Sequence, residues 1–260
     1  MREFVTTQTD GRILTVTINR PDVMNALHHA AHEELAATFD AFAADPDLWV
    51  AIVTGAGDRA FCAGNDLKAT AATPLKDRKP FPPSGFGGIT HRSDLTKPVI
   101  AAVNGIAFGG GFEIALASDI IVASDRAVFA LPEPLVGLAA VAGGIHRLAR
   151  MIPMKQAMGM LLTGRRVDAA EGRELGFVNE VVPHDQLMAS ARDWADRILK
   201  CSPLAVRATK QCAYAGLEHG GVHAALAAEY PALKAMRASE DFIEGPRAFA
   251  GKRQPIWVGR

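Results

Sequence analysis

The segment that decides the fold runs from Asn104 to Glu113 and reads Asn-Gly-Ile-Ala-Phe-Gly-Gly-Gly-Phe-Glu. Its first residues are the end of an apolar stretch over 98–105 that is typical of a buried strand. Its last residues are the beginning of an apolar helical pattern over 109–118. Three consecutive glycines at a helix start expose N–H groups in front of the helix dipole, which suits a developing negative charge. A lone carboxylate, Glu113, on so apolar a helix is costly unless it has a function. The segment therefore predicts a strand–turn–helix unit that carries a functional site.

The pattern around this segment alternates between strands and helices. Further strands are predicted over 12–18, 49–55, 119–124, 127–131 and 177–182. Helices are predicted from Asn25 to Phe42 and, later in the chain, over 145–162, 168–175, 184–200, 203–217 and 221–237. Such alternation indicates an α/β fold with a largely parallel sheet. We expect a core over residues 1–200, a helical C-terminal region over 201–260, and a lid or mobile loop over 70–97, where proline and glycine are frequent.

Composition narrows the function classes. The chain has 260 residues, with 28 Lys plus Arg and 28 Asp plus Glu, so its formal net charge is zero. A balanced charge gives no electrostatic footprint for nucleic acid or an anionic membrane. Cys62, Cys201 and Cys212 are odd in number and lack CxxC spacing, which argues against a disulfide framework or a cysteine zinc site. With neither a signal-peptide pattern nor a long uncharged run, we expect a cytoplasmic protein that does not bind membranes.

Two other motifs carry polar groups between small or restricted residues. Phe-Cys-Ala-Gly-Asn-Asp-Leu-Lys over 61–68 follows a predicted strand, and its small residues let the backbone approach a ligand; a helix start capped by Asp66 is the structural alternative. Phe-Ala-Leu-Pro-Glu-Pro-Leu-Val-Gly over 129–137 places Glu133 between two prolines and apolar neighbours. Such surroundings favour a protonated carboxylic acid, which is useful for acid–base work; a solvent-facing turn glutamate is the alternative.

Taken together and in order, these segments resemble the crotonase (enoyl-CoA hydratase/isomerase) superfamily from about residue 10 to the end of the chain. The resemblance rests on Asn19-Arg-Pro followed by Asn25-Ala-Leu27, on AGNDLK, on GGGFE, and on the Pro-Glu turn before GG-x-x-R-L. It implies a crotonase-like spiral core of ββα units and a C-terminal helical trimerisation region. It also implies an acyl-CoA substrate, a homotrimer or dimer of trimers, and no metal or redox cofactor.

The resemblance assigns roles to single residues. The backbone N–H groups of Asn65 and Gly110 match the two halves of an oxyanion hole, and Glu113 and Glu133 match the catalytic glutamates of the hydratases. Residues expected to line the thioester and pantetheine arm are Ala63, Gly64, Asp66, Leu67 and Lys68. Phe249 and Lys252 match a Phe-x-x-Lys element that approaches the CoA adenine, often from a neighbouring subunit.

The implied reaction is hydration of a short enoyl-CoA, or the reverse dehydration. An enoyl-CoA isomerase, which needs one base, is the nearest alternative, and the pair of glutamates favours hydration. A non-catalytic RNA-binding protein of the same fold is a different class of reading, and the zero net charge argues against it.

Within the family the chain looks most like the carnitinyl-CoA dehydratase branch. AGNDLKA (63–69), FALPE (129–133) and the tail over 239–260 carry this likeness. The branch typically has Trp where this chain has Asn65, and Ala140 and Val141 depart from the family pattern in the expected pocket wall. A trimethylammonium group would need a carboxylate or a ring, such as Phe81, Phe86 or Phe112. We therefore rank a short enoyl-CoA above crotonobetainyl-CoA as substrate.

One pair of histidines has the spacing of a metal site. His28 and His32 lie four residues apart on the first predicted helix. Glu33 and Glu34 follow them directly, so we interpret this face of the helix as solvated surface. G-x-S-x-G and G-x-x-x-x-G-K-[ST] motifs are absent from the sequence, which leaves serine-hydrolase and P-loop functions unsupported.

Overall fold

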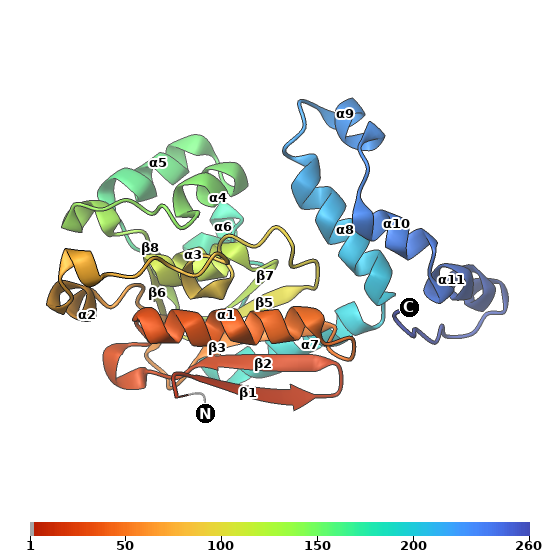
Figure 1. Cartoon of the computed structure of the whole chain (residues 1–260), viewed down its shortest axis with the longest axis horizontal. Coiled ribbons are helices and arrows are strands. Elements are labelled where there is room, and N and C mark those ends of the chain that lie inside the picture. The colour runs from red at the N-terminus through yellow and green to blue at the C-terminus, as the bar shows by residue number, and fades with distance from the viewer. Residues whose placement is uncertain (1–2) are drawn as a thin grey trace.

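A six-stranded sheet forms the centre of the molecule in the computed structural model, which describes residues 3–260. Figure 1 shows this sheet with helices on both faces. Its order is β1-β2-β3-β5-β7-β10, with β1 antiparallel to β2 and the other neighbours parallel. The strands are β1 (Val5–Asp10), β2 (Ile13–Ile18), β3 (Val50–Gly55), β5 (Val99–Val103), β7 (Ile120–Ser124) and β10 (Glu180–Val182).

A second, smaller sheet stands beside the first in the order β4-β6-β8-β9. Its strands are β4 (Ala60–Cys62), β6 (Ile106–Phe108), β8 (Val128–Ala130) and β9 (Val167–Asp168). Along the chain, one strand of the large sheet is followed by one strand of the small sheet and then by a helix. The units are β3-β4-α2 (Leu67–Ala72), β5-β6-α3 (Gly110–Ala117) and β7-β8-η4 (Glu133–Val136). This repetition confirms the predicted α/β fold and the spiral of ββα units.

The core lies on both faces of the large sheet. β3 and β5 are buried along their whole length, which explains why their sequences are continuous apolar runs rather than alternating ones. Helix α1 (His29–Ala44) covers one face through Phe39 and Phe42, both fully buried. Helix α7 (Leu187–Leu199) covers the other face, where Ala191 and Ala195 are buried against β3 and β5. The two layers hold the strand ends that carry the candidate site.

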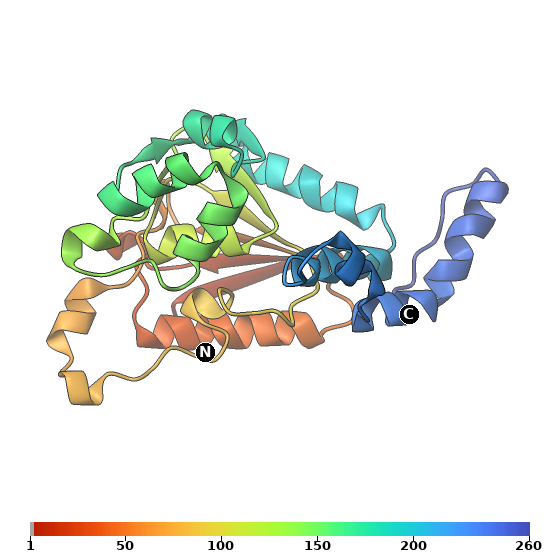
Figure 2. The ribbon, with the colours of Figure 1, turned by 90° about the horizontal axis from the view of Figure 1, so that it is seen from above.

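The last part of the chain is helical and extends away from the sheets, although Lys210 of α8 (Pro203–Gly216) pairs with Asp119 next to β7. Figure 2 shows the C-terminal helices extending to one side of the α/β body. They are α8, α9 (Val222–Ala227), α10 (Pro231–Arg237) and α11 (Glu240–Ala250). Several apolar side chains here are strongly exposed, with Leu217 at 72%, Leu226 at 80% and Phe249 at 88%. Within residues 3–260, no helix is both long and apolar enough to cross a membrane.

Proline accounts for two differences from the predicted helices. The pattern over 145–162 is two helices, α4 (Gly144–Met151) and α5 (Met154–Thr163), separated at Pro153. The pattern over 221–237 is likewise divided before Pro231 into α9 and α10. Proline lacks a backbone N–H and pushes the residue before it out of the helical region, so each helix ends ahead of it. Helix α6 (Ala169–Leu175) follows α5 and agrees with the pattern over 168–175. Helix α11 lies within the predicted helical C-terminal region, but no separate helix was predicted at its position.

The segment over 70–97 is less irregular than predicted. It contains the end of α2 and two short 3-10 helices, η2 (Leu75–Asp77) and η3 (Phe86–Gly88). Residues 74–84 are mostly exposed, whereas the stretch from Phe86 to Thr90 is buried and packs against α1. The second half of the segment is therefore part of the core and not a free loop.

Candidate active site

Two glycine-containing segments meet at the ends of adjacent strands in the small sheet. Strands β4 and β6 pair in parallel, so the turn after Cys62 lies beside the turn that opens α3. A Cβ atom added to Gly111 would lie 1.9 Å from the carbonyl oxygen of Cys62, and one added to Gly64 would lie 3.2 Å from the Gly110 nitrogen. Only glycine permits backbones to approach this closely, which explains the residue type at these positions.

Each of the two segments presents a backbone N–H without a partner. Gly110 is the first residue of α3, so its N–H has no acceptor within the helix. Next to Asn65, Leu27 donates to the Gly64 oxygen at 2.8 Å and Asp66 donates to the Leu27 oxygen at 2.9 Å. The Asn65 N–H itself makes no hydrogen bond among residues 3–260. Two unpaired donors on adjoining backbones, one of them at a helix N-terminus, can stabilise an oxyanion.

The ring of Phe86 packs against Gly110, one of the two donors. A Cβ atom on Gly110 would lie 2.3 Å from Phe86 Cζ, so the ring occupies the space that a side chain at position 110 would need. Phe86 is 3% exposed and belongs to η3, which also contacts α1 and α3. Its apolar edge excludes water from one side of the Gly110 N–H, which strengthens electrostatic interactions there.

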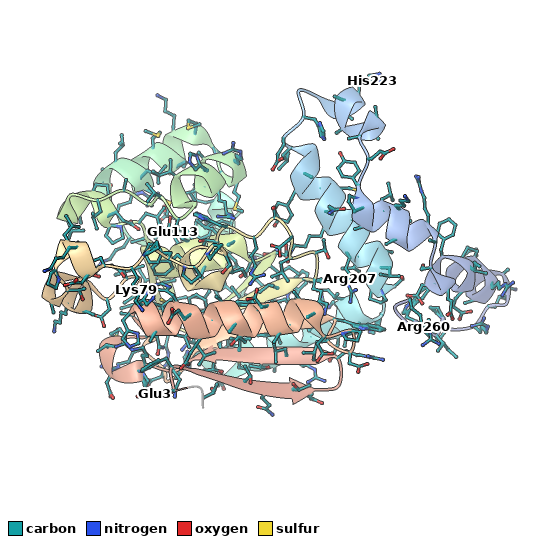
Figure 3. All side chains as sticks on the ribbon, viewed as in Figure 1. Glu3, Lys79, Glu113, Arg207, His223 and Arg260 are labelled. Carbon is teal, nitrogen blue, oxygen red and sulfur yellow. The ribbon has the colours of Figure 1, made fainter. Side chains whose placement is uncertain are left out.

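Glu113 is buried one turn into α3, at 3% exposure (Figure 3). Its Oε1 accepts a hydrogen bond of 2.8 Å from the backbone N–H of Gly144, at the start of α4. Burial, together with the nearby charge of Glu133, raises the pKa of this carboxyl to about 7 against the opposing hydrogen bond from Gly144. The group can therefore exchange a proton near neutral pH, as a general base requires.

Glu133 opens η4 between Pro132 and Pro134, directly after strand β8. Its Oε1 is 3.1 Å from the position that a Cβ atom on Gly109 would occupy, so the carboxyl lies against the glycine turn. Its Oε2 is buried and has no hydrogen-bond partner among residues 3–260. Burial raises the pKa of Glu133, as the apolar neighbours in the sequence predict. The structure thus brings both predicted glutamates and both predicted donors to one place.

The other residues of the predicted thioester-binding segment have different surroundings. Asp66 caps α2 by accepting from the Ala69 N–H at 3.1 Å and pairs with Arg20 at 3.1 Å, so the structural alternative holds for its side chain. Leu67 and Lys68 are exposed on α2. Ala63, partly buried, donates its N–H to the Met24 oxygen at 3.0 Å. The side-chain amide of Asn65 donates to the Thr70 hydroxyl at 2.9 Å.

Phe249 and Lys252 are not brought to this site within one chain. They lie at the end of α11, whereas α2 is at the opposite end of the molecule (Figure 1). Figure 3 likewise labels Glu113 in the α/β body, Arg207 and His223 on the C-terminal helices, and Arg260 at the end of the tail that follows α11. Phe249 and Lys252 therefore do not lie beside α2 of their own chain, and their role at the site of a neighbouring chain stays a prediction.

The rings considered for binding a trimethylammonium group, and the two residues expected in the pocket wall, differ in how exposed they are. Phe112 is fully buried against Phe129 and Phe177, so it cannot contact a ligand. Phe81 is 51% exposed and is the most accessible of the three rings named from the sequence. Ala140 is buried at 4%, and a Cβ on Gly144 would be 3.0 Å from both its Cβ and the Glu113 Oε1. Val141, by contrast, is 73% exposed.

The interpretation of His32 as a solvated residue is wrong. His32 is 1% exposed, whereas His28 is partly buried and caps α1 by accepting from the Ala31 N–H. The sequence holds a signal that indicates this burial, because His32 precedes Leu35 by three residues and Phe39 by seven, which places it on their face of the helix. Among residues 3–260, no three His, Cys, Asp or Glu side chains are grouped to hold a metal ion.

Comparisons with known proteins agree with this geometry. The family model described as enoyl-CoA hydratase/isomerase matches residues 8–260. Carnitinyl-CoA dehydratase from Citrobacter koseri is 46% identical over 256 residues, covering 96% of each chain, and that from Proteus mirabilis is 46% identical with 97% of each covered.

Solved structures give the same result. A crystal structure of enoyl-CoA hydratase from Mycobacterium tuberculosis H37Rv superimposes with a TM-score of 0.90 at 39% identity, covering 99% of each chain. Enoyl-CoA hydratase from Bacillus anthracis superimposes with a TM-score of 0.90 at 33% identity, covering 99% of this chain and 100% of that one. The fold is therefore the crotonase fold, and the chain belongs to the enoyl-CoA hydratase/isomerase family, whose members named here are hydro-lyases acting on CoA thioesters.

Proposed function

We propose that this protein catalyses the reversible hydration of a short trans-2-enoyl-CoA. One observation carries the proposal: two carboxyls with raised pKa, the buried Glu113 and the partly buried Glu133, lie close to each other and to the glycine turn whose Gly110 N–H is unpaired. An isomerase needs one acid–base group at this place, whereas addition of water needs one group for the water and one for the α-carbon. The pair therefore favours hydration over double-bond migration.

The proposed reaction begins with the thioester oxygen accepting hydrogen bonds from the Asn65 and Gly110 N–H groups. Glu113, ionised, takes a proton from water as the water oxygen bonds to the β-carbon. Charge moves onto the thioester oxygen, where each preorganised donor contributes about 3–4 kcal/mol. Glu133, protonated, then gives its proton to the α-carbon. No metal or redox cofactor takes part in this proposed chemistry.

Burial raises the pKa of both carboxyls, which favours a pair that shares a proton. Two neighbouring carboxyls in a low-dielectric site do not both ionise readily, so the pair passes through a state that holds one proton. Hydration uses the state in which Glu113 is ionised and Glu133 protonated, and dehydration uses the opposite state. One proton shared between Glu113 and Glu133 is therefore enough for both hydration and dehydration.

Replacing either glutamate tests the mechanism. Glu133→Gln and Glu113→Gln should each lower kcat for crotonyl-CoA hydration by at least about 100-fold, since each removes a positioned acid–base group. The assay follows loss of the conjugated thioester absorbance, with CoA binding measured separately as a control for folding. Near-normal turnover by either variant would contradict the two-glutamate mechanism.

The pH profile gives an independent test. Because protonation of Glu113, whose pKa is about 7, removes the proposed base and ionisation of Glu133 removes the proposed acid, kcat/KM for hydration should fall on both the acidic and the basic side of a maximum. In Glu113→Gln the remaining rate should lack this acidic limb, while wild-type protein measured under the same buffers shows it. A wild-type rate that stays constant between about pH 5 and about pH 8 is incompatible with the base role.

Crotonobetainyl-CoA is the second candidate substrate, favoured by the 46% identity to carnitinyl-CoA dehydratases. Against it, Phe86 and Phe112 are packed within the protein, which leaves Phe81 as the one accessible ring of the three. We expect kcat/KM to be higher for crotonyl-CoA than for crotonobetainyl-CoA. A preference of about tenfold or more for the betaine thioester, or about 1.4 kcal/mol, would reverse this ranking.

We also propose that the protein assembles as a homotrimer or a dimer of trimers in the cytoplasm, with the region over 201–260 forming much of the interface. The exposed apolar side chains of α8, α9 and α11 support this, since they need a partner surface. Light scattering should therefore give three or six times the chain mass of 27.6 kDa. A stable monomer at micromolar concentration contradicts the proposal.

A further inference from the structure

Arg147 is a partly buried cation that the proposed reaction does not use. It lies on α4 and is the arginine of the Gly-Gly-x-x-Arg-Leu motif. Burial lowers its pKa, and the charges of Tyr214 and Glu113 act in the opposite direction, so the guanidinium stays protonated. Within residues 3–260 it donates only to backbone carbonyls. Taking a cation partly out of water costs free energy, so we looked for what its contacts provide.

The guanidinium lies on the turn that leads into α4. Its Nη1 donates a long hydrogen bond of 3.5 Å to the Ala142 oxygen. A Cβ atom added to Gly143 would clash with the same nitrogen, so the guanidinium fills the space that a side chain at position 143 would need. Gly143 has a φ of 110°, in the left-handed region that favours glycine. The backbone over 142–144 is therefore shaped against Arg147.

This turn holds the carboxyl of Glu113. Gly144 donates its backbone N–H to Glu113 Oε1 at 2.8 Å. Gly144 is also the first residue of α4, so its N–H has no acceptor within the helix. A hydrogen bond donated to a carboxylate favours the ionised form and fixes the direction of its oxygens. The proposed base is thus held through a turn on which Arg147 packs.

Arg147 also connects the turn to the other side of the site. Its Nη2 donates to the Thr90 oxygen at 2.7 Å, and Thr90 is buried. The Thr90 N–H in turn donates to the oxygen of Phe86, whose ring packs against Gly110. One planar fork therefore joins the backbone that holds the proposed base to the backbone beside one oxyanion donor. A lysine has the same charge but lacks this fork.

The charge of Arg147 also affects the balance around Glu113. Helix α3 packs against α4, η3 and strands β4, β5 and β6. These strands and η3 carry one titratable side chain, the Cys62 thiol, whose pKa burial raises to about 12, so it is neutral near pH 7. From η4, the charge of Glu133 opposes ionisation of Glu113, and from α4 the charge of Arg147 favours it. Without Arg147, only the hydrogen bonds of the turn would favour the ionised base.

We propose that Arg147 is a positioning residue for Glu113. It holds the carbonyls of Ala142 and Thr90, which fixes the turn that donates to the carboxylate, and its charge favours the ionised base. Arg147 acts through Glu113 and not on the substrate. The inference rests on the proposed function for the base role of Glu113.

Arg147→Met tests the proposal, because methionine is also unbranched but has neither the charge nor the donors. The ionised form of Glu113 loses an opposite charge, so the acidic limb of kcat/KM for crotonyl-CoA hydration should move to higher pH by about one unit. Misplacement of the base should also lower kcat at the pH optimum by at least about tenfold. Arg147→Lys keeps the charge without the fork and should restore part of both effects.

Arg150→Met is the matched control. Arg150 is exposed on the same helix and donates to the oxygen of His146, also exposed, one turn earlier. Its replacement should leave the acidic limb and kcat unchanged. A second comparison adds Arg147→Met to Glu113→Gln. Because no carboxylate remains to be positioned there, kcat should fall no further, as expected for two residues that act as one unit.

The carboxyl of Glu113 can also be titrated without substrate. In protein labelled with carbon-13 at the glutamate carboxyls, the Glu113 signal is the one that Glu113→Gln lacks. Its midpoint should lie at higher pH in Arg147→Met than in wild-type protein or Arg150→Met. This measurement separates two failures, because a protein that shows the shift but does not hydrate crotonyl-CoA contradicts the proposed function and not the contact between Arg147 and the turn.

Two results would overturn the inference. One is an acidic limb and a Glu113 midpoint that stay in place in Arg147→Met. The other is a loss of kcat that is as large in the Glu113→Gln background as in wild-type protein, which would indicate general damage to the fold. Circular dichroism on each variant checks folding. If Arg147→Met does not fold, Arg147→Lys decides, since a kcat equal to that of wild-type protein in this variant contradicts a role for the fork.

Discussion

The contact between the backbone after β4 and the first turn of α3 is the constraint on which the site depends. The Cys62 carbonyl occupies the space where a Gly111 side chain would begin, and Gly64 abuts the Gly110 nitrogen. Both unpaired N–H groups come from this one contact, so their separation is set by backbone packing and not by side-chain rotamers. A donor pair fixed in this way needs no reorganisation as charge develops.

Two buried side-chain amides, Asn25 and Asn104, stabilise the turn that leads to this contact. Asn25 Nδ2 donates to the Ala56 and Ala60 oxygens at 3.0 and 2.7 Å, and Asn104 Nδ2 donates to the Gly55 and Gly57 oxygens at 2.9 and 2.8 Å. These bonds satisfy the carbonyls of the turn from β3 to β4, which would otherwise be buried without donors. The turn therefore delivers Cys62 to one position beside β6. Asn25 and Asn104, which belong to the sequence motifs, therefore stabilise the backbone of the turn and take no part in the proposed chemistry.

The sequence predicted the α/β core, and the residues of the proposed chemical centre could be named from it more readily than the residues around them. Continuous apolar runs identify β3 and β5, and the Gly-Gly-Gly-Phe-Glu and Pro-Glu-Pro patterns locate both glutamates. Strands β4, β6 and β9 have two or three residues each, too few to show a period, so the small sheet was missed. His32 was misplaced because its acidic neighbours suggested solvent, whereas the segment that covers it, with Gly87, lies 55 residues further along the chain.

This division explains why strong identity to carnitinyl-CoA dehydratases does not identify the acyl group. The proposed reacting centre consists of two backbone N–H groups and two carboxyls, and its proposed targets, the thioester, the α-carbon and the β-carbon, are common to every enoyl-CoA. A cavity next to Asn65 is lined instead by side chains of α1, α2 and the segment after α2. Asn65 belongs both to the proposed reacting centre and to this cavity. Its backbone N–H is present whatever side chain stands at position 65, whereas its side-chain amide, bonded to Thr70, forms part of the cavity wall. A substitution at position 65 therefore alters the cavity wall while it keeps the backbone N–H that we propose for the chemistry.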